Sequence, residues 1–394
     1  MNAPSLKRLP LVVIHSFPVW LYQTQTWMYN QVRYLPKEIE PHIVCETTEN
    51  LDQFAVPYIH ALRDASKWRS LWDKGLRKLK MRSYLGFGIV VAQKENASVL
   101  HSHFGDIGWI DLNVAKRAKL KHVVTFYGYD VNELPNRDVR WHQRYQSLFR
   151  QVERILCEGS HMARCVVQLG CPPEKVRVHH LGIALDEIAF QPRTWRDGEP
   201  LRVLIAATFT EKKGIPYAIE ALGLLQHEIP LEITVIGDAK NHPESLAEKQ
   251  KILATIEKHQ LQSKVSLLGF QPHQFMLEAA YKHHIFLSPS VTADTGETEG
   301  GAPVSLIEMA ATGMPVVSTT HCDIPEVIRH GITGLLAPER DVKGLVELLR
   351  SLIRTPEQWH PMLIAGREHL EKEFNAQIQG KKLAAIYQEL LQQN

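Results

Sequence analysis

The sequence predicts an α/β protein made of two doubly wound domains that face each other across a cleft. Its length of 394 residues suits two domains better than one. In both halves, short runs of β-branched residues alternate with longer amphipathic stretches. Many of the short runs end in Gly, Ser or Asp and lead into a helix, which is typical of parallel sheets. Ligands of such sheets bind beyond the carboxyl ends of the strands, so the cleft suits a two-part substrate.

The apolar and β-branched runs predict strands, and the amphipathic runs predict helices. In the first half, strands are expected over residues 9–14, 41–45, 56–61, 97–102, 121–128, 153–159 and 175–182, and helices over 26–35, 70–93, 111–119, 140–151 and 160–170. The second half has predicted strands over residues 201–207, 231–238, 264–270, 284–290 and 314–319, and helices that begin near Gly214, Glu244, Pro272 and Pro303. After Leu336 the chain is expected to be helical, most clearly over residues 344–353 and 379–393.

These elements predict an N-terminal domain over residues 1–188 and a C-terminal domain over residues 189–372. A final helix over residues 373–394 is expected to pack back on the first domain. The polar stretch Asp186–Pro200 has neither the helical nor the strand period, so it is predicted to be an inter-domain linker.

The composition excludes several classes of protein. Hydrophobic residues make up 44% and charged residues 22%, and the formal net charge is +2, so neither disorder nor nucleic-acid binding is expected. The five cysteines form no Cys-x-x-Cys pair, which argues against a zinc ribbon or a disulfide framework and fits a reducing compartment. No run approaches the ~20 apolar residues of a membrane span. A cytoplasmic location is therefore expected.

The segment Thr292–Thr319, TADTGETEGGAPVSLIEMAATGMPVVST, combines a glycine turn with an apolar helix. Pro303 suits the first turn of that helix, and Gly313 is expected to end it after about three turns. Gly300 and Gly301 precede the helix N-terminus, where bare backbone and the helix dipole favour an anion. The segment therefore predicts an anion site.

One acid, Glu308, lies within the apolar part of this helix. A buried carboxylate must be paired or hydrogen-bonded, so Glu308 is a candidate ligand-binding group. The alternative is that it shares a solvated stripe with Ser305 and Thr312.

The segment resembles the signature of glycosyltransferase family 4, retaining enzymes of the GT-B fold with two Rossmann-like domains. That signature is an acid, a glycine turn, an apolar helix with a second acid, and then Gly-x-Pro-Val-Val. Further similar motifs in the second half are EKKGIPYAIEAL (211–222), TVIGD (234–238), LLGF (267–270), PSVTA (289–293) and HCDIPEVIRHGITGLLAPERD (321–341). In the first half, TQTWMYNQV, HSHFGDIG and TFYGYDV resemble more weakly a polysaccharide-assembly branch of the family.

The resemblance implies that the second domain binds a nucleotide-diphosphate sugar. Glu308 would accept hydrogen bonds from the ribose, Glu299 would hold hydroxyls of the donor sugar, and Lys213 would neutralise the diphosphate. The base would lie near Phe270. The backbone that would cradle the diphosphate is that of Gly300, Gly301, Ala302, Pro303 and Val304.

In the second domain, the sequence departs from the family pattern at two points. Eight residues separate Glu299 from Glu308, where the family usually has seven, so Glu297 is an alternative sugar-binding acid. The usual Gly-Arg before the lysine is Ala207-Thr208, which removes a bidentate phosphate donor from the position of Thr208. Lys212 would replace that donor, or else it is a solvated surface lysine.

A third departure lies in the first domain, where Tyr127 replaces the histidine of the family's Thr-Phe-His-Gly motif. A tyrosine donates a hydrogen bond but is not a base near neutral pH without a large shift of its pKa. His103 and Asp130 are further polar candidates expected at the same strand ends. The alternative for His103 is a core histidine that the backbone satisfies.

The resemblance implies retaining transfer of a sugar from a nucleotide-diphosphate donor to a glycan or lipid-linked acceptor in surface polysaccharide biosynthesis. Such transfer depends on positioning and charge stabilisation rather than on a side-chain base. The chain contains no Asp-x-Asp sequence, so no metal or other cofactor is expected. A nucleotide-sugar epimerase, a phosphorylase and a non-catalytic nucleotide-sugar binder are the alternatives. A dinucleotide dehydrogenase is disfavoured because no Gly-x-Gly-x-x-Gly follows a predicted strand.

The stretch from Leu62 to Gly88 is basic and contains interleaved tryptophans and leucines. A basic amphipathic helix of this kind is typical of a segment that lies on an anionic membrane surface. The alternative is a core helix whose aromatic residues face the sheet and whose lysines face water.

Overall fold

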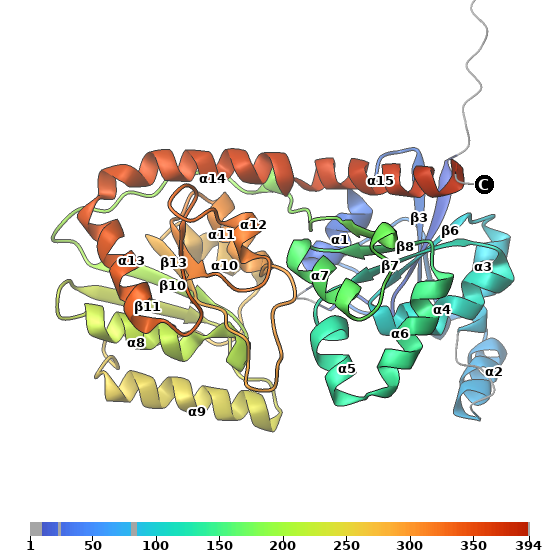
Figure 1. Ribbon diagram of the computed structural model, residues 1–394, viewed down its shortest axis with the longest axis horizontal. Coiled ribbons are helices and arrows are strands. Elements are labelled where there is room, and N and C mark those ends of the chain that lie inside the picture. The colour runs from blue at the N-terminus through green and yellow to red at the C-terminus, as the bar shows by residue number, and fades with distance from the viewer. Residues whose placement is uncertain (1–9, 23–24, 80–84, 393–394) are drawn as a thin grey trace, which may run out of the picture. The chain divides into compact units, whose positions relative to one another are not determined.

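The structure is a computed structural model that describes residues 10–22, 25–79 and 85–392. The chain forms two compact units (Figure 1). The first unit comprises Met1–Gly182 together with Ala376–Asn394, and the second comprises Ile183–Asn375. The first unit is therefore built from two segments that are far apart in the sequence.

A parallel sheet forms the centre of the first unit. Within the described residues it has seven strands in the order β5-β3-β1-β6-β7-β8-β9. Its strands are β1 (Leu11–Ser16), β3 (Ile39–Cys45), β5 (Ile59–Ala61), β6 (Val99–His103), β7 (Lys121–Phe126), β8 (Arg154–Cys157) and β9 (Val176–Val178). Two short strands, β2 (Val19–Trp20) and β4 (Thr47–Thr48), pair with each other beside it.

Successive residues of these strands are buried against opposite layers of helices, as the strand period requires. Val13 and Val123 pack with Leu383 of the C-terminal helix α15 (Ala376–Gln392). Their neighbours Ile14 and Val124 pack on the other face, where α3 (Gly86–Lys94), α4 (Gly105–Ala118) and α6 (Arg140–Gln151) lie. The expected return of the C-terminal helix to the first domain is thus confirmed.

The expected helix over residues 70–93 is instead two helices. The first, α2 (Lys67–Lys78), ends at its C-cap Leu79, and α3 begins after Leu85. Residues 80–84, which the expected helix includes, lie outside the described residues. The remaining helical segments of the unit are α1 (Thr26–Arg33), a π-helical turn (Tyr129–Glu133), α5 (Leu134–Arg137) and α7 (Ser160–Gln168), with short 3₁₀ turns at Leu62–Asp64 and Pro173–Lys175.

The second unit has a parallel sheet of its own, with six strands across the described part of the chain, in the order β12-β11-β10-β13-β14-β15. The strands are β10 (Leu201–Ala206), β11 (Leu231–Ile236), β12 (Val265–Leu267), β13 (Ile285–Ser288), β14 (Val316–Thr319) and β15 (Leu335–Ala337). The edge strand β15 was not expected from the sequence, because its three residues are too few to show a period.

Helices cover both faces of this second sheet. Val203 and Ile205 pack in a core with residues of α8 (Ile215–Leu225), α9 (Pro243–Lys258) and α13 (Val342–Arg354). Leu204 and Phe286 pack in a second core with residues of α10 (His273–Ala280), α11 (Val304–Ala311), α12 (Ile324–Val327) and α14 (Trp359–Glu373). The unit also has short 3₁₀ turns at Leu185–Glu187, Glu211–Lys213 and Pro356–Gln358.

The stretch Asp186–Pro200 is not a linker but part of the second unit. Trp195 is 5% exposed and packs in the core of that unit. The guanidinium of Arg193 is buried and donates to the carbonyl oxygens of Ala280 and His283, at 3.0 and 3.1 Å. The sequence shows no period here because these residues are held by side-chain hydrogen bonds and packing rather than by a helix or strand.

Two further expectations concern the whole chain. The five cysteines all lie in the described ranges and are free thiols. Among the helices that the structure describes, each is too short or too polar to cross a lipid bilayer.

Candidate functional site

Glu308, the acid within the apolar helix, is hydrogen-bonded to a histidine. Helix α11 begins after Pro303 and ends before Gly313, whose φ of +85° only glycine adopts readily. Glu308 is 6% exposed, and its Oε1 lies 2.8 Å from Nε2 of His273, the first residue of α10. The solvated-stripe alternative is therefore wrong, because the carboxylate is buried and paired.

The pairing changes the chemistry of His273. Its hydrogen bond to Glu308 raises the pKa of His273, burial lowers it, and the negative charges of Glu308 and Glu187 raise it further. The net pKa is above the usual value of 6.5. The pair thus places an imidazole donor beside a carboxylate near the start of α10. No sequence pattern indicates His273, since it lies 35 residues from Glu308 and belongs to no motif.

Two lysines of the turn after β10 meet two acids of the glycine-rich loop. Nζ of Lys213 lies 2.8 Å from Oε2 of Glu299, and Nζ of Lys212 lies 2.7 Å from Oε1 of Glu297. Lys212 also donates to the carbonyl oxygen of Thr298 at 3.2 Å. Lys212 is therefore not the solvated surface lysine that one interpretation of the sequence expected.

Glu299 is the more enclosed of the two acids. Its side chain is 6% exposed, against 30% for Glu297, and its Oε1 accepts a hydrogen bond from the Ser290 hydroxyl at 2.8 Å. Burial alone would raise the pKa of Glu299, but the charges of Lys213 and Lys212 lower it below its usual value. Glu299 is thus an ionised carboxylate with both oxygens already engaged, and Glu297 is the more accessible acid.

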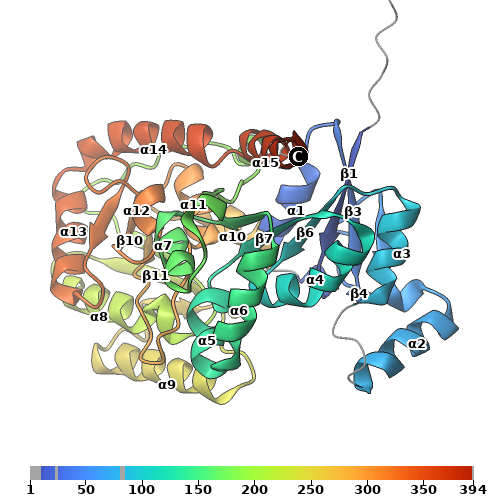
Figure 2. The same cartoon turned by 45° about the vertical axis from the view of Figure 1, so that its right-hand side comes forward.

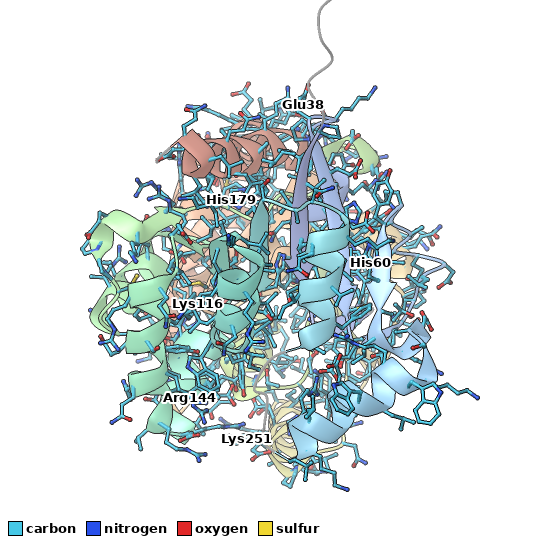
Figure 3. The ribbon with its side chains drawn as sticks, turned by 90° about the vertical axis from the view of Figure 1, so that its right-hand side faces the viewer. Glu38, His60, Lys116, Arg144, His179 and Lys251 are labelled. Carbon is cyan, nitrogen blue, oxygen red and sulfur yellow. The ribbon has the colours of Figure 1, made fainter. Side chains whose placement is uncertain are left out.

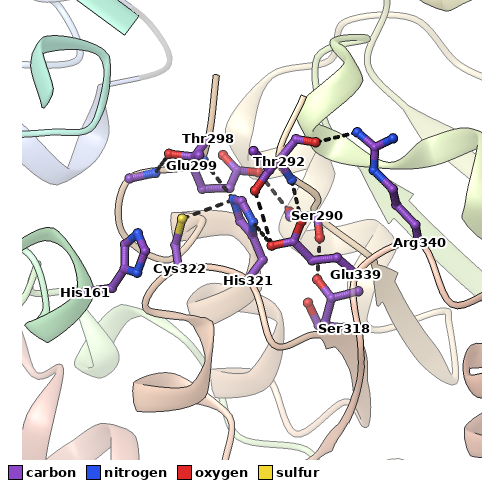
Figure 4. A network of polar contacts seen from close by, with 12 residues as sticks. His161, Ser290, Thr292, Thr298, Glu299, Ser318, His321, Cys322, Glu339 and Arg340 are labelled. Carbon is purple, nitrogen blue, oxygen red and sulfur yellow. Dashed lines mark hydrogen bonds and ion pairs between the residues drawn. The ribbon is translucent and has the colours of Figure 1, made fainter. Parts of the chain in front are cut away.

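A histidine and a third glutamate hold the backbone of this loop (Figure 4). The Glu299 N–H donates to Nε2 of His321 at 3.0 Å, and Nδ1 of His321 lies 2.6 Å from Oε1 of Glu339. Since Nε2 accepts, Nδ1 carries the proton, and His321 is neutral. The other oxygen of Glu339 accepts from the Thr292 N–H at 2.7 Å. His321 and Glu339 lie in a motif that carried the resemblance, but their own positions predicted no role.

The other expected donor-binding residues lie on loops that follow the carboxyl ends of the strands. Thr208 and Lys213 follow β10, Phe270 follows β12, and the glycine turn follows β13. Gly300 has a φ of +79°, and its N–H donates to the Thr298 hydroxyl at 3.1 Å. Phe270 is 56% exposed, which leaves its ring open to a ligand. Gly300, Gly301 and Pro303 are buried, while Ala302, Val304 and Thr208 are partly buried.

The first unit brings Tyr127 and His103 together. Nδ1 of His103, at the end of β6, lies 2.6 Å from the hydroxyl of Tyr127, which follows β7. Nε2 of the same ring lies 3.1 Å from Nδ1 of His15. Burial lowers the pKa of His103 and raises the pKa of Tyr127. His103 is thus a buried, neutral histidine. Its hydrogen-bond partners are side chains, whereas the core-histidine alternative expected backbone groups. Tyr127 is a neutral hydrogen-bonding group.

Asp130 fixes the backbone of two loops. One carboxylate oxygen accepts from the Gly105 N–H at 2.7 Å, and the other accepts from the Tyr127 N–H at 2.9 Å. Burial raises the pKa of Asp130 to about 7, although both hydrogen bonds lower it. Asp130 therefore joins the segments after β6 and β7.

A cavity of about 220 Å³ adjoins the same strand ends in the first unit. It is lined by Phe17, Met28, Phe104, Asp106, Ile107 and Tyr129, among others. Burial raises the pKa of Asp106, the acid of this lining. The cavity therefore presents aromatic rings and one carboxyl group, which are the groups that bind sugar faces and hydroxyls. Asp106 lies in the HSHFGDIG motif, but the sequence did not distinguish it.

The basic segment exposes its apolar side chains. Trp68, Leu71, Trp72 and Leu79 are 84%, 65%, 62% and 70% exposed. Helix α2, which carries the first three, lies at the margin of the first unit beside α3 (Figure 2). The core-helix alternative is wrong, because these aromatic residues do not pack on the sheet.

Two family models together match most of the chain. The model described as "Glycosyltransferase Family 4" matches residues 24–187, and the model described as "Glycosyl transferases group 1" matches residues 187–383. The amylovoran biosynthesis glycosyltransferase AmsK of Erwinia amylovora is 34% identical over 77% of this chain and 73% of its own length. The putative colanic acid biosynthesis glycosyltransferase WcaL of Escherichia coli K12 is 32% identical over 76% of this chain and 72% of its own length.

Solved structures share the fold at lower sequence identity. A glycosyltransferase from Rickettsia africae superposes with a TM-score of 0.75 at 15% identity and covers 98% of this chain and 100% of its own. Anabaena Alr3699/HepE, solved with UDP and glucose, has a TM-score of 0.73 at 13% identity and covers 96% of this chain and 100% of its own.

Proposed function

Because the chain belongs to glycosyltransferase family 4, we propose that it transfers a sugar, with retention of the anomeric configuration, from a nucleotide-diphosphate donor to a glycan or lipid-linked acceptor. It has the GT-B fold and is a glycosyltransferase of polysaccharide biosynthesis. The epimerase, phosphorylase and non-catalytic alternatives have no support, since the relatives named above are glycosyltransferases.

The buried pair of Glu308 and His273 carries the proposal for donor binding. Oε1 of Glu308 is engaged by His273, so Oε2 is available to accept from the ribose hydroxyls. The exposed ring of Phe270, close before α10 in the sequence, suits contact with the nucleotide base. A buried carboxylate that accepts hydrogen bonds from ribose hydroxyls discriminates well against a ligand without those hydroxyls. With such a ligand bound, the carboxylate would stay buried with half of its hydrogen bonds unmade.

We propose that the lysine pair stabilises the departing diphosphate without a metal ion. Lys213 uses one of its three N–H donors on Glu299, so two remain for phosphate oxygens. Lys212 takes the place of the arginine that the family usually has at Thr208. The backbone of residues 300–304 would approach the same phosphates at the start of α11. Turnover that persists in EDTA would support this, and loss of turnover restored only by a divalent ion would contradict it.

For the acceptor side, we propose that no side chain acts as the base. Tyr127 and His103 are neutral and share a hydrogen bond, so they suit positioning the acceptor better than taking a proton from it. The departing diphosphate would take the acceptor proton during attack on the same face of the sugar. The cavity next to Asp106 would hold the acceptor saccharide.

Release of nucleoside diphosphate from a panel of UDP-, GDP- and ADP-sugars tests the proposed function. UDP-sugars come first in the panel, because HepE is solved with UDP. Stabilisation by one nucleotide series in thermal shift, slow release of the matching diphosphate and its loss in Glu308→Ala are expected. Donor binding without release, in the presence of lipid and oligosaccharide extracts, would favour a binding protein instead.

We also propose that α2 attaches the enzyme to an anionic membrane, as a peripheral protein at the cytoplasmic face. Its exposed Trp68 and Trp72 stand among basic residues, and a lipid-linked acceptor would give the attachment a purpose. Flotation with anionic liposomes is expected for the wild type and to be reduced in Trp68→Ser/Trp72→Ser. Val139→Ser, which alters an equally exposed apolar residue elsewhere, is the matched control. Absence of flotation at low salt would refute the attachment.

A further inference from the structure

Three metal-binding side chains converge at the edge of the first unit's sheet, apart from the candidate site. They are His42 on β3, His60 on the edge strand β5 and Glu95 at the end of α3. One ligand atom from each lies within 4.8 Å of the others. His42 is buried, and His60 and Glu95 are partly buried (Figure 3 labels His60). The group therefore combines a fixed ligand with two that solvent can reach.

The two imidazoles already meet nitrogen to nitrogen. Nδ1 of His42 lies 3.0 Å from Nε2 of His60, and the rings are 5.2 Å apart between centroids with 9° between their planes. The rings are thus nearly coplanar and meet edge to edge. Two imidazoles bound to one tetrahedral ion at about 2.0–2.1 Å have their nitrogens roughly 3.4 Å apart. An ion bound by both nitrogens would therefore need a separation a few tenths of an ångström longer and a tilt of the rings, so that both lone pairs point at the ion instead of along the N–N line.

A carboxylate outside this group sets the orientation of His42. Nε2 of His42 lies 3.0 Å from Oε1 of Glu40, so Nε2 carries the proton and Nδ1 presents a lone pair towards His60. A carboxylate behind a ligating histidine is the usual second-shell arrangement of metal sites. The ring of Tyr58 stacks on His42 at 4.5 Å and further fixes it. His42 is thus held in the tautomer that a metal ion requires.

We propose that His42, His60 and Glu95 bind a divalent ion of the zinc class, with solvent as the remaining ligand. Two imidazoles and one carboxylate suit zinc or cobalt better than magnesium or calcium. Glu95 is now paired with Lys94 at 2.9 Å, but the Lys94 side chain is 74% exposed and is free to turn to solvent. On binding, the proton between the two rings leaves Nε2 of His60, and the neutral ring then carries a proton on Nδ1. No covalent or redox step is involved.

A bound ion would stabilise the fold at this edge of the sheet rather than take part in catalysis. It would join the end of α3 to β3 and the edge strand β5, which already pair with each other in the sheet. His42 lies in the middle of β3, whereas the candidate residues of this unit lie at or beyond the carboxyl ends of β6 and β7. The inference is therefore independent of the proposed function.

A second histidine group in the same unit has a different geometry. The rings of His101 and His103 are stacked at 4.3 Å, whereas His15 and His103 meet nitrogen to nitrogen at 3.1 Å. Both nitrogens of His101 are engaged at 2.6 Å, by Tyr387 and by Thr125. Because these contacts and the hydrogen bond of His103 to Tyr127 occupy the ring nitrogens that a metal ion would need, this group serves as an internal control.

Metal titration of tag-free protein, stripped with EDTA, tests the proposal. Calorimetry should show that one equivalent of zinc binds. One equivalent of cobalt should give the visible spectrum of a tetrahedral or five-coordinate ion. Zinc should also raise the melting temperature of the protein. His60→Gln and Glu95→Gln should each weaken binding at least tenfold, and neither should change basal transferase activity. Lys94→Ala, which frees Glu95, should bind as well as wild type or more tightly.

His227→Gln, at an exposed histidine, and His103→Gln should leave zinc binding unchanged. Absence of stoichiometric binding overturns the proposal. So does binding that survives in both His60→Gln and Glu95→Gln, or binding that is lost in His103→Gln but kept in His60→Gln. If His60→Gln does not fold, Glu95→Gln and Lys94→Ala decide the question.

Discussion

Glu308 and its histidine leave one carboxylate oxygen for a ligand, and this predicts a measurable loss on substitution. Glu308→Gln preserves the shape of the side chain but replaces a charged acceptor with a neutral amide. Hydrogen bonds to charged groups contribute about 1.5–3 kcal/mol, so affinity for the donor nucleotide should fall about 10- to 100-fold. Calorimetry with the matching nucleoside diphosphate measures this. Glu347→Gln, at an exposed acid of α13, is the control and should bind normally.

The same pair predicts how stability depends on pH. The pKa of His273 is raised in the folded protein by Glu308, despite partial burial, and Glu187 adds to the effect. The stabilisation is therefore complete below the unfolded pKa of 6.5 and is lost as pH rises through the higher folded value. Urea denaturation from about pH 6 to about pH 9 should show the difference between wild type and His273→Gln shrinking with pH. A constant difference would mean that the pair contributes no proton linkage.

At the level of single residues, the sequence identified groups that break a local pattern. Glu308 was found because it is the one acid in an apolar helix. Its partner His273 was not, since the contact depends on how α10 packs on α11 and leaves no local periodicity. Tyr127 stands out as a departure from a motif. Its hydrogen bond to His103, however, depends on the pairing of β6 with β7 in the sheet. The roles of the individual donor-site residues remain predictions.

Among the elements, the glycine-rich loop that follows β13 depends on His321. His321→Ala would leave the partly buried N–H of Glu299 without its acceptor, which costs about 1 kcal/mol, the lower end of the range for a buried group. The free energy of unfolding should fall by that amount, and hydrogen exchange at Glu299 should accelerate. His360→Ala, at an exposed histidine of α14, should change neither. An unchanged exchange rate at Glu299 would show that the loop does not depend on His321.

Contact between α15 and the end of α1 depends on Gly380, which has no side chain. A Cβ at Gly380 would overlap the carbonyl oxygen of Tyr34, so Gly380→Ala must push the two elements apart. A destabilisation of about 1–3 kcal/mol is expected in urea denaturation. Gly75→Ala, in the exposed helix α2, meets no atom within 4 Å and should instead stabilise by about 0.5–1 kcal/mol. Equal effects of the two substitutions would contradict this packing argument.

Strands and most helices follow from periodicity, whereas their ends and breaks do not. The interruption between α2 and α3 falls within a continuous amphipathic pattern, and so one long helix was expected there. The segment Asp186–Pro200 has no period, which predicts a linker, although Arg193 and Trp195 are buried in the second unit. Such irregular segments are held by contacts with residues distant in sequence, which a local pattern does not record.

For the whole molecule, the division into units predicts an active fragment. The second unit is one continuous segment with two apolar cores of its own, and it contains Lys213, Phe270, Glu299 and Glu308. Residues 183–375 expressed alone should therefore fold and bind the donor nucleotide within about tenfold of the full chain. Calorimetry on the fragment measures this. A folded fragment without affinity would show that the first unit supplies donor contacts.

The two-segment construction of the first unit also determines the order in which the protein can be completed during synthesis. Domains usually fold as units from the N-terminus as the chain emerges. Here the sheet face that α15 covers, including Val13, Val99 and Val123, has no partner until Ala376 and the residues after it have been made. The second unit, although later in the sequence, is complete before the first. The nascent first unit thus carries an uncovered apolar face throughout the synthesis of its neighbour, which is the kind of surface that promotes aggregation before folding is complete.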